Sequence, residues 1–208
     1  MAFTKDATML PRGIVREAKA MAVTNEGRAG AGIPWRLIFW GGAAALLGVP
    51  LLARWPWTTS DFLFAAVMFG TVGGIFELAV RMTPNPAYRA GVAVALGAAF
   101  LLVWINGAVG IIGDEDNPAN LMYLGVIAIA LAGAVVAAFR ASGMARAMFA
   151  AAGAQGLVTA ITLLAGLGAN EPPGALGVLG LNLFFVMPWL LSGGLFRKAS
   201  RDARAAQL

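Results

Sequence analysis

The chain of 208 residues contains no cysteine and no histidine. Without cysteine it has no disulfide, no thiolate ligand for a metal and no thiol nucleophile. Without histidine it has no imidazole base and no histidine ligand for haem or a metal. Charged residues make up only 12% of the chain, about half of the usual share of roughly 25%. These absences argue against an enzyme and against a water-soluble domain, whose surface needs more charge.

Hydrophobic residues make up 60% of the chain and gather in six runs. A transmembrane helix needs about 20 mainly apolar residues. The predicted spans are residues 34–53, 62–80, 88–113, 118–139, 144–167 and 175–196. These runs are too long and too uniformly apolar for barrel strands, whereas a helix satisfies its own backbone polar groups in lipid. We therefore predict an all-α, polytopic membrane helix bundle with six transmembrane helices.

The distribution of basic residues predicts the orientation of these spans. If both termini are cytoplasmic, Arg54 is the only one of the 15 lysine and arginine residues on the opposite side. Because cytoplasmic loops carry the excess of basic residues, we predict that both termini lie inside. Trp55, Trp57 and Tyr123 would then lie at the outer membrane interface, where aromatic side chains are common.

The predicted domain organisation has three parts. Residues 1–33 form a basic cytoplasmic tail, with no apolar stretch typical of a signal peptide. Ile14, Ala18, Met21 and Ala22 recur at helical spacing in this tail, so it is either a helix lying on the inner leaflet or a solvated segment. Residues 34–197 form the six-helix domain, and residues 198–208 form a second basic cytoplasmic tail.

Glu77 is the only acidic residue inside a predicted span, near the inner end of the second one. An unpaired charge at this depth is costly. Arg81 follows four residues later, so the two side chains share one helix face and can form an intramembrane ion pair. The alternative is a proton or cation site at Glu77, and the local partner favours the structural pair.

A polar stripe on the fifth span is the strongest candidate for a solute site. Gln155, Thr159 and Thr162 follow helical spacing and therefore lie on one face. Asn106 in the third span and Asn182 in the sixth are expected at a similar depth. These residues either line a small polar cavity or form interhelical hydrogen bonds that hold the bundle together. The second interpretation is favoured. Amides and hydroxyls alone select weakly, so even the cavity would not name a solute.

Two further features concern contacts with other molecules. Gly70 and Gly74 have the GxxxG spacing, which lets another helix approach the second span closely, within the chain or between subunits. Asp114, Glu115 and Asp116 form an acidic periplasmic loop. That loop is interpreted as a topology signal with a helix cap. The alternatives are a cation site with oxygen ligands and a docking point for a basic partner. We predict no metal.

The stretch GIIGDEDNPANLMY at residues 110–123 resembles a family of small, uncharacterised bacterial polytopic inner-membrane proteins. Residues 88–90 and 143–147 share the pattern, and the resemblance covers roughly the second through fifth spans. It implies a multi-pass protein of the bacterial inner (plasma) membrane. It transfers no activity and no site residues.

These observations favour a non-enzymatic accessory or interaction protein that packs against a partner or itself through faces rich in glycine and alanine. The alternative is a small-solute or ion carrier or channel that uses the polar layer of the third, fifth and sixth spans. Either way the chain contacts the lipid bilayer. We expect no cofactor and no nucleic acid, and leave open a homo-oligomer or a membrane-protein partner.

Overall fold

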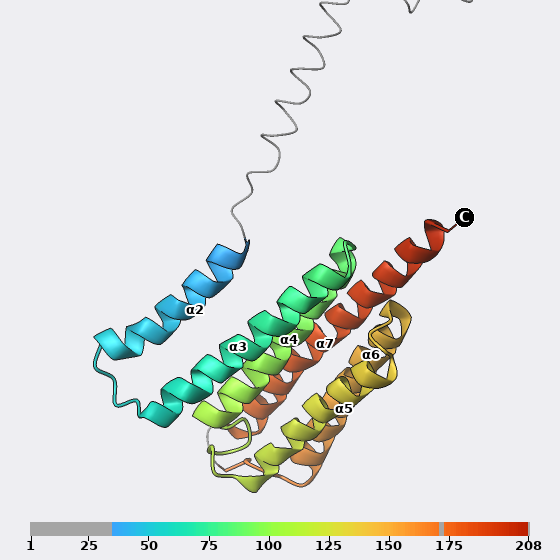
Figure 1. Ribbon diagram of the computed structural model, residues 1–208. Helices are drawn as coiled ribbons and strands as arrows, with labels where there is room; N and C mark the ends of the chain where they lie inside the picture. The colour runs from blue at the N-terminus through green and yellow to red at the C-terminus, as the bar shows by residue number, and fades with distance from the viewer. Residues whose placement is uncertain (1–34, 171–172, 208) are drawn as a thin grey trace, which may run out of the picture. The chain divides into compact units, whose positions relative to one another are not determined.

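A computed structural model describes residues 35–170 and 173–207. The predicted tail at residues 1–33 therefore lies outside the described residues. The helices are α2 (Trp35–Leu52), α3 (Thr59–Met82), α4 (Pro86–Ala108), α5 (Met122–Val136), α6 (Ala141–Leu164) and α7 (Gly174–Ala205), with a short 3-10 helix, η1 (Pro118–Leu121), before α5 (Figure 1). The described residues contain no strand. The all-α prediction is confirmed, as are six helices long and apolar enough to cross a membrane.

The described residues divide into two compact units, with the boundary between Phe62 and Leu63. In the first unit, Ala43 and Pro50 are the buried residues of α2, and large side chains such as Leu37 and Leu52 are exposed, at 70% and 84%. Such an apolar surface is stable in lipid but not in water. The following segment ends in a capping box, in which the backbone N–H of Thr58 donates to the Asp61 carboxylate at 2.7 Å and starts α3.

The second unit is built around α6, which has more buried residues than any other described helix. It packs against both α5 and α7, and α7 also packs against α4. On the far side of α4, aromatic rings hold α3: the Phe69 and Phe100 centroids are 5.1 Å apart, and those of Phe64 and Trp104 are 6.5 Å apart. Rings of this size keep α3 further from α4 than the small residues of α6 keep their neighbours.

Small residues decide how closely α5 and α6 approach. A Cβ atom added at Gly133 of α5 would lie 2.6 Å from the Cβ atom of Ala147, and one added at Gly143 would overlap Ala137. Bare backbone therefore permits the contact. By contrast, a Cβ atom at Gly70 or Gly74 of α3 would meet no atom within 4 Å. Within the second unit, the predicted GxxxG pair packs against no other described residue.

Two helix ends differ from the prediction by five residues or more. The third span was predicted to residue 113, but α4 ends at Ala108, because Gly110 adopts a left-handed φ of 73° and the chain turns. The sixth span was predicted to residue 196, but α7 continues to Ala205. Its last turns contain no proline or glycine, and Lys198 pairs with Asp202 one turn later at 3.0 Å. Most of the predicted C-terminal tail is therefore helical.

Candidate functional site

A buried polar cluster joins three helices of the second unit. It consists of Tyr123 on α5, Gln155 on α6 and Asn182 on α7. The Oδ1 atom of Asn182 accepts a hydrogen bond from Nε2 of Gln155 at 2.8 Å, and its Nδ2 atom donates to the Tyr123 hydroxyl at 2.9 Å. Nδ2 also donates to the Val178 carbonyl oxygen at 2.9 Å, which fixes the Asn182 side chain against its own helix. One amide thus connects α5, α6 and α7.

The structure brings the predicted polar layer together only in part. Thr159 and Thr162 are buried, but each hydroxyl donates to a carbonyl oxygen of its own helix, at 2.8 Å. Nδ2 of Asn106 likewise donates to the Leu102 carbonyl oxygen of α4, at 2.7 Å. Of the predicted residues, Gln155 and Asn182 are therefore the pair that bonds across helices.

Tyr123 is the member of the cluster that sequence reasoning missed. We predicted it at the outer membrane interface, and that depth stays a prediction; the structure adds that the side chain faces into the helix bundle, because Tyr123 is 1% exposed. A buried tyrosine hydroxyl needs a hydrogen-bond partner, and Asn182 supplies it. One signal in the sequence could have found it. Tyr123 lies inside an apolar span, and the polar side chains of the neighbouring spans need hydrogen-bond partners.

The cluster is closed to solvent. Gln155 and Asn182 both have 0% exposure. Oε1 of Gln155 is the one buried side-chain acceptor of the cluster without a partner among the described residues. None of the three residues is an acid or base that works near neutral pH. The arrangement can therefore hold helices in register, and it offers a solute no path of entry.

Glu77 and Arg81 lie on one face of α3, near its C-terminal end. Oε1 of Glu77 and a guanidinium nitrogen of Arg81 are 2.9 Å apart. The Arg81 side chain is 69% exposed and that of Glu77 is 19% exposed. The arginine thus extends outward from the helix while neutralising the more buried carboxylate, as expected of a snorkelling side chain.

The acidic loop is organised by a residue that the prediction did not single out. Oδ1 of Asn120 accepts hydrogen bonds from the backbone N–H groups of Ile111 at 3.1 Å and Ile112 at 2.9 Å. Its Nδ2 donates to the Asp114 carbonyl oxygen at 2.7 Å. A buried asparagine therefore ties down backbone groups that would otherwise lack partners.

The three acids of the loop lie on the surface. Asp114, Glu115 and Asp116 are all exposed. Among the described residues, no group of three acidic side chains is placed to hold a metal ion. The cap is present, since Oδ1 of Asn117 accepts a hydrogen bond from the backbone N–H of Ala119 at 3.0 Å at the start of η1. The role of the loop as a topology signal stays a prediction.

A second candidate site is an apolar groove on the flank of the second unit. This lateral groove has a volume of about 440 Å³. Its rims are Ile75, Leu78 and Met82 of α3 and Leu131 and Val135 of α5. Its floor includes Ala95 and Ala99 of α4, Met144 and Met148 of α6, and Trp189 of α7.

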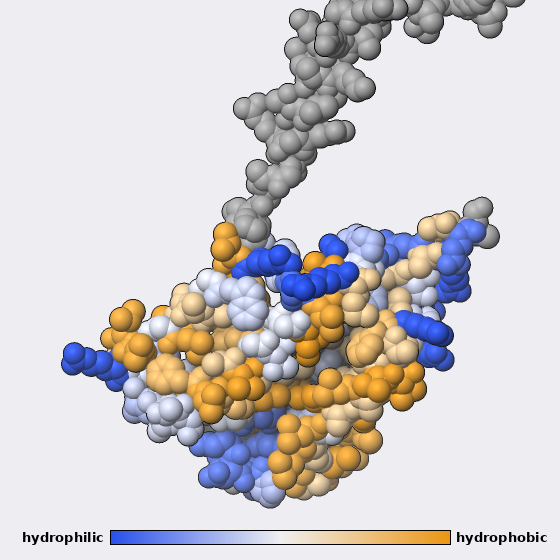
Figure 2. Space-filling model, in the orientation of Figure 1, coloured by the Kyte–Doolittle hydropathy of each residue, from blue (hydrophilic) through white to orange (hydrophobic). Residues whose placement is uncertain are grey.

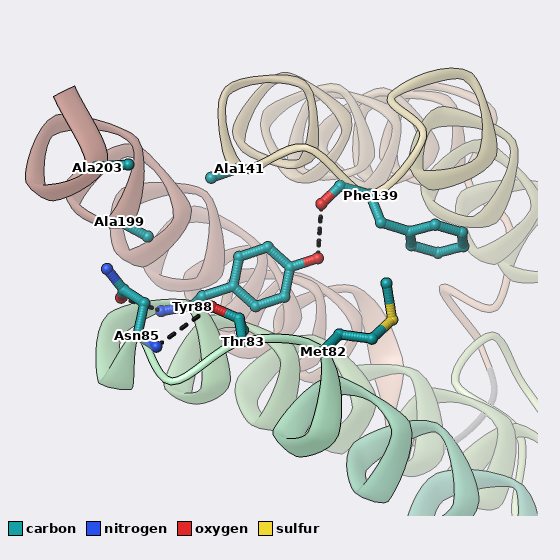
Figure 3. A pocket seen from close by; sticks show the side chains of 8 residues that line it. All are labelled: Met82, Thr83, Asn85, Tyr88, Phe139, Ala141, Ala199 and Ala203. Carbon is teal, nitrogen blue, oxygen red and sulfur yellow. Dashed lines mark hydrogen bonds between the residues drawn. The ribbon is translucent and has the colours of Figure 1, made fainter. Parts of the chain in front are cut away.

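A smaller cavity, the inner pocket, adjoins the groove and has a volume of about 240 Å³ (Figure 3). Met82, Tyr88 and Phe139 line both cavities. The hydroxyl of Tyr88 donates to the Phe139 carbonyl oxygen at 2.7 Å, so this bond lies between the two. Thr83 and Asn85 give the inner pocket the polar surface that the groove lacks.

The described residues therefore form an all-helical protein with six candidate membrane-spanning helices, a closed polar cluster and a lateral apolar groove. No protein-family model, no curated protein and no solved structure matches the chain. The resemblance to a bacterial inner-membrane family stays a prediction.

Proposed function

We propose that the protein is a multi-pass protein of the bacterial inner membrane with both termini in the cytoplasm. The six long apolar helices and the concentration of lysine and arginine on one side support this placement. Because the natural chain has no cysteine, Asp116→Cys introduces a single thiol in the loop before α5. We expect a membrane-impermeant thiol reagent to label it from the periplasmic side. Labelling only after lysis would contradict the topology.

Within that membrane, the protein acts as a non-enzymatic accessory protein that packs against another transmembrane helix. The observation that carries this proposal is a face of α3 that no helix of the second unit covers. Gly70 and Gly74 leave bare backbone there, with nothing within 4 Å of a Cβ atom at either position. Leu63, Val67 and Leu78 lie on the same face and are 65%, 58% and 56% exposed. Small residues flanked by large apolar ones favour close helix association in lipid.

The closed polar cluster is the reason to place transport second. A carrier site requires a cavity that a solute can reach, with polar atoms left free to bind it. Gln155 and Asn182 have no exposed surface and bond to one another. They support a rigid scaffold formed by α5, α6 and α7. The face of α3 that carries Gly70 and Gly74 points away from this scaffold.

The test is purification from native membranes in a mild detergent, with the mass and the co-purifying proteins measured. We expect a stoichiometric complex with a membrane protein or with a second copy. Gly70→Leu combined with Gly74→Leu should dissociate it, because leucine side chains block close approach. Gly153→Leu combined with Gly156→Leu is the matched control, since these α6 glycines also face open space. A lone wild-type monomer would contradict the proposal.

A further inference from the structure

The lateral groove is shaped to hold a hydrocarbon chain. Its walls are apolar except at Tyr88, and its volume of about 440 Å³ falls in the range of ligand sites, roughly 300–1,000 Å³. Alanines line it from two helices, Ala95 and Ala99 from α4 and Ala130 and Ala134 from α5. These short side chains do not fill the space between the two helices. In a bilayer an unfilled apolar groove loses dispersion contacts, so a lipid chain is the occupant that its surroundings supply.

One end of the groove is basic. Three segments include or flank the residues that line the inner pocket: 77–89, 139–146 and 197–204. Together they contain eight arginine and lysine residues but only two acids, Glu77 and Asp202. The basic residues are Arg81, Arg89, Arg140, Arg146, Arg197, Lys198, Arg201 and Arg204. In Figure 2, hydrophilic side chains gather near the C-terminal end of α7, and hydrophobic side chains cover the flank next to it. This charge complements an anionic headgroup.

The basic residues at this end differ in what they already bind. Arg81 pairs with Glu77, and the guanidinium group of Arg89 donates to the carbonyl oxygens of Thr83 and Val80, both at 2.7 Å. Arg140 is exposed and lies between Phe139 and Ala141, two residues that line the inner pocket. Arg204 follows Ala203, which lines the pocket from α7, and its Nε makes a long hydrogen bond to the Ser200 carbonyl oxygen at 3.4 Å. Arg140 and Arg204 are therefore the residues best placed to meet a phosphate there.

We propose that the lateral groove holds one acyl chain of an anionic phospholipid from the inner leaflet, with its phosphate group at the inner pocket. The Tyr88–Phe139 hydrogen bond then lies at the boundary between the acyl chain and the headgroup of the lipid. The inference rests on the proposed membrane placement. It does not depend on the proposed partner of α3.

The first test measures lipid that stays bound to the purified protein. The wild type is extracted in mild detergent, and native mass spectrometry counts the retained phospholipids. We expect about one anionic phospholipid per chain. The filled-groove variant, Ala95→Leu with Ala99→Leu, should lose it. The control, Ala93→Leu with Ala132→Leu, changes exposed alanines of α4 and α5 outside the groove and should keep it. Equal retention in the two variants would overturn the proposal.

The headgroup is tested separately. Arg140→Gln and Arg204→Gln should each weaken retention of phosphatidylglycerol about fivefold, the effect of roughly 1 kcal/mol per basic residue near an anionic headgroup. Arg54→Gln, in the loop between α2 and α3, is the control and should have no effect. Retention that is unchanged in both arginine variants, or equal for phosphatidylglycerol and phosphatidylcholine, would overturn the anionic assignment.

A second measurement decides the outcome if the filled-groove variant fails to fold. Trp189 lines the groove, so brominated acyl chains should quench its fluorescence. In vesicles of phosphatidylcholine, a few per cent of brominated phosphatidylglycerol should quench the wild type more than the same amount of brominated phosphatidylcholine does. Trp189→Phe should remove that difference. An identical difference in Trp189→Phe would overturn the proposal.

These outcomes are distinct from those that test the function of α3. A lone wild-type monomer that still retains the lipid would contradict the accessory role and support the lipid site. A stoichiometric complex without retained anionic lipid would support the accessory role and contradict the lipid site.

Discussion

Nε2 of Gln155 on α6 donates a hydrogen bond to Oδ1 of Asn182 on α7 at 2.8 Å, and neither residue has any exposed surface. The two positions are 27 residues apart in the chain. The same Asn182 amide reaches Tyr123 on α5. The two hydrogen bonds of Asn182 therefore fix how α5, α6 and α7 are rotated relative to one another, since all three side chains must face inward at the same depth.

Gln155→Leu should lower the free energy of unfolding by about 0.5–2 kcal/mol, because interhelical hydrogen bonds in membranes are modest. Asn182→Leu should cost more, since it also leaves the Tyr123 hydroxyl without its partner. Unfolding of the reconstituted protein in mixed micelles measures both. The loss in the double variant should be smaller than the sum. Thr162→Val is the control, because its hydroxyl bonds only to Val158; its effect should add to that of Asn182→Leu.

Glu77 and Arg81 should behave as a unit. Glu77→Gln leaves Arg81 without its counter-charge, and Arg81→Gln leaves a largely buried carboxylate near lipid. Each single change should lower the melting temperature in detergent, and the neutral double variant should recover part of the loss. Lys198→Gln breaks the exposed Lys198–Asp202 pair and should change stability by less than about 1 kcal/mol. Strictly additive losses at positions 77 and 81 would indicate that Glu77 has an independent role.

Asn120→Leu should be among the most damaging single changes in the loops. It removes the acceptor for the N–H groups of Ile111 and Ile112, which are buried with 0% exposure. An unsatisfied buried donor costs about 1–3 kcal/mol, so the variant should lose several kcal/mol in an unfolding titration. Asp116→Asn, at an exposed position of the same loop, should leave the transition unchanged. A similar loss in both variants would show that charge stabilises the loop.

Ala138→Gly should stabilise the protein. Ala138 adopts a left-handed φ of 46° at the end of α5, a conformation that costs a non-glycine residue about 1–2 kcal/mol. Glycine removes that strain and adds some entropy to the unfolded chain, so the net gain should be about 0.5–1 kcal/mol. Ala132→Gly, at an exposed position inside α5, should instead destabilise by about 0.5–1 kcal/mol. Thermal unfolding in detergent compares the two.

The sequence alone determined the number and approximate extent of the helices. Each predicted span contains enough apolar residues to cross a bilayer, and α2 and α3 begin and end within three residues of the predicted bounds. The reason is physical: helical hydrogen bonds are local, and a span in lipid has no alternative partners for its backbone. The pairing of Glu77 with Arg81 could be predicted for the same reason, because four residues of separation place both on one helix face.

Tertiary structure decided which side chains meet. These helices are apolar on nearly every side, so the sequence leaves their rotation about their own axes open. That rotation turns Tyr123 inward to Asn182, and the register between α5 and α6 places Gly133 against Ala147. Asn120, which lies eight and nine residues beyond Ile112 and Ile111, folds back to bind the backbone that would otherwise have continued α4. The lateral groove likewise forms only once the helices pack, because its lining residues come from five separate helices.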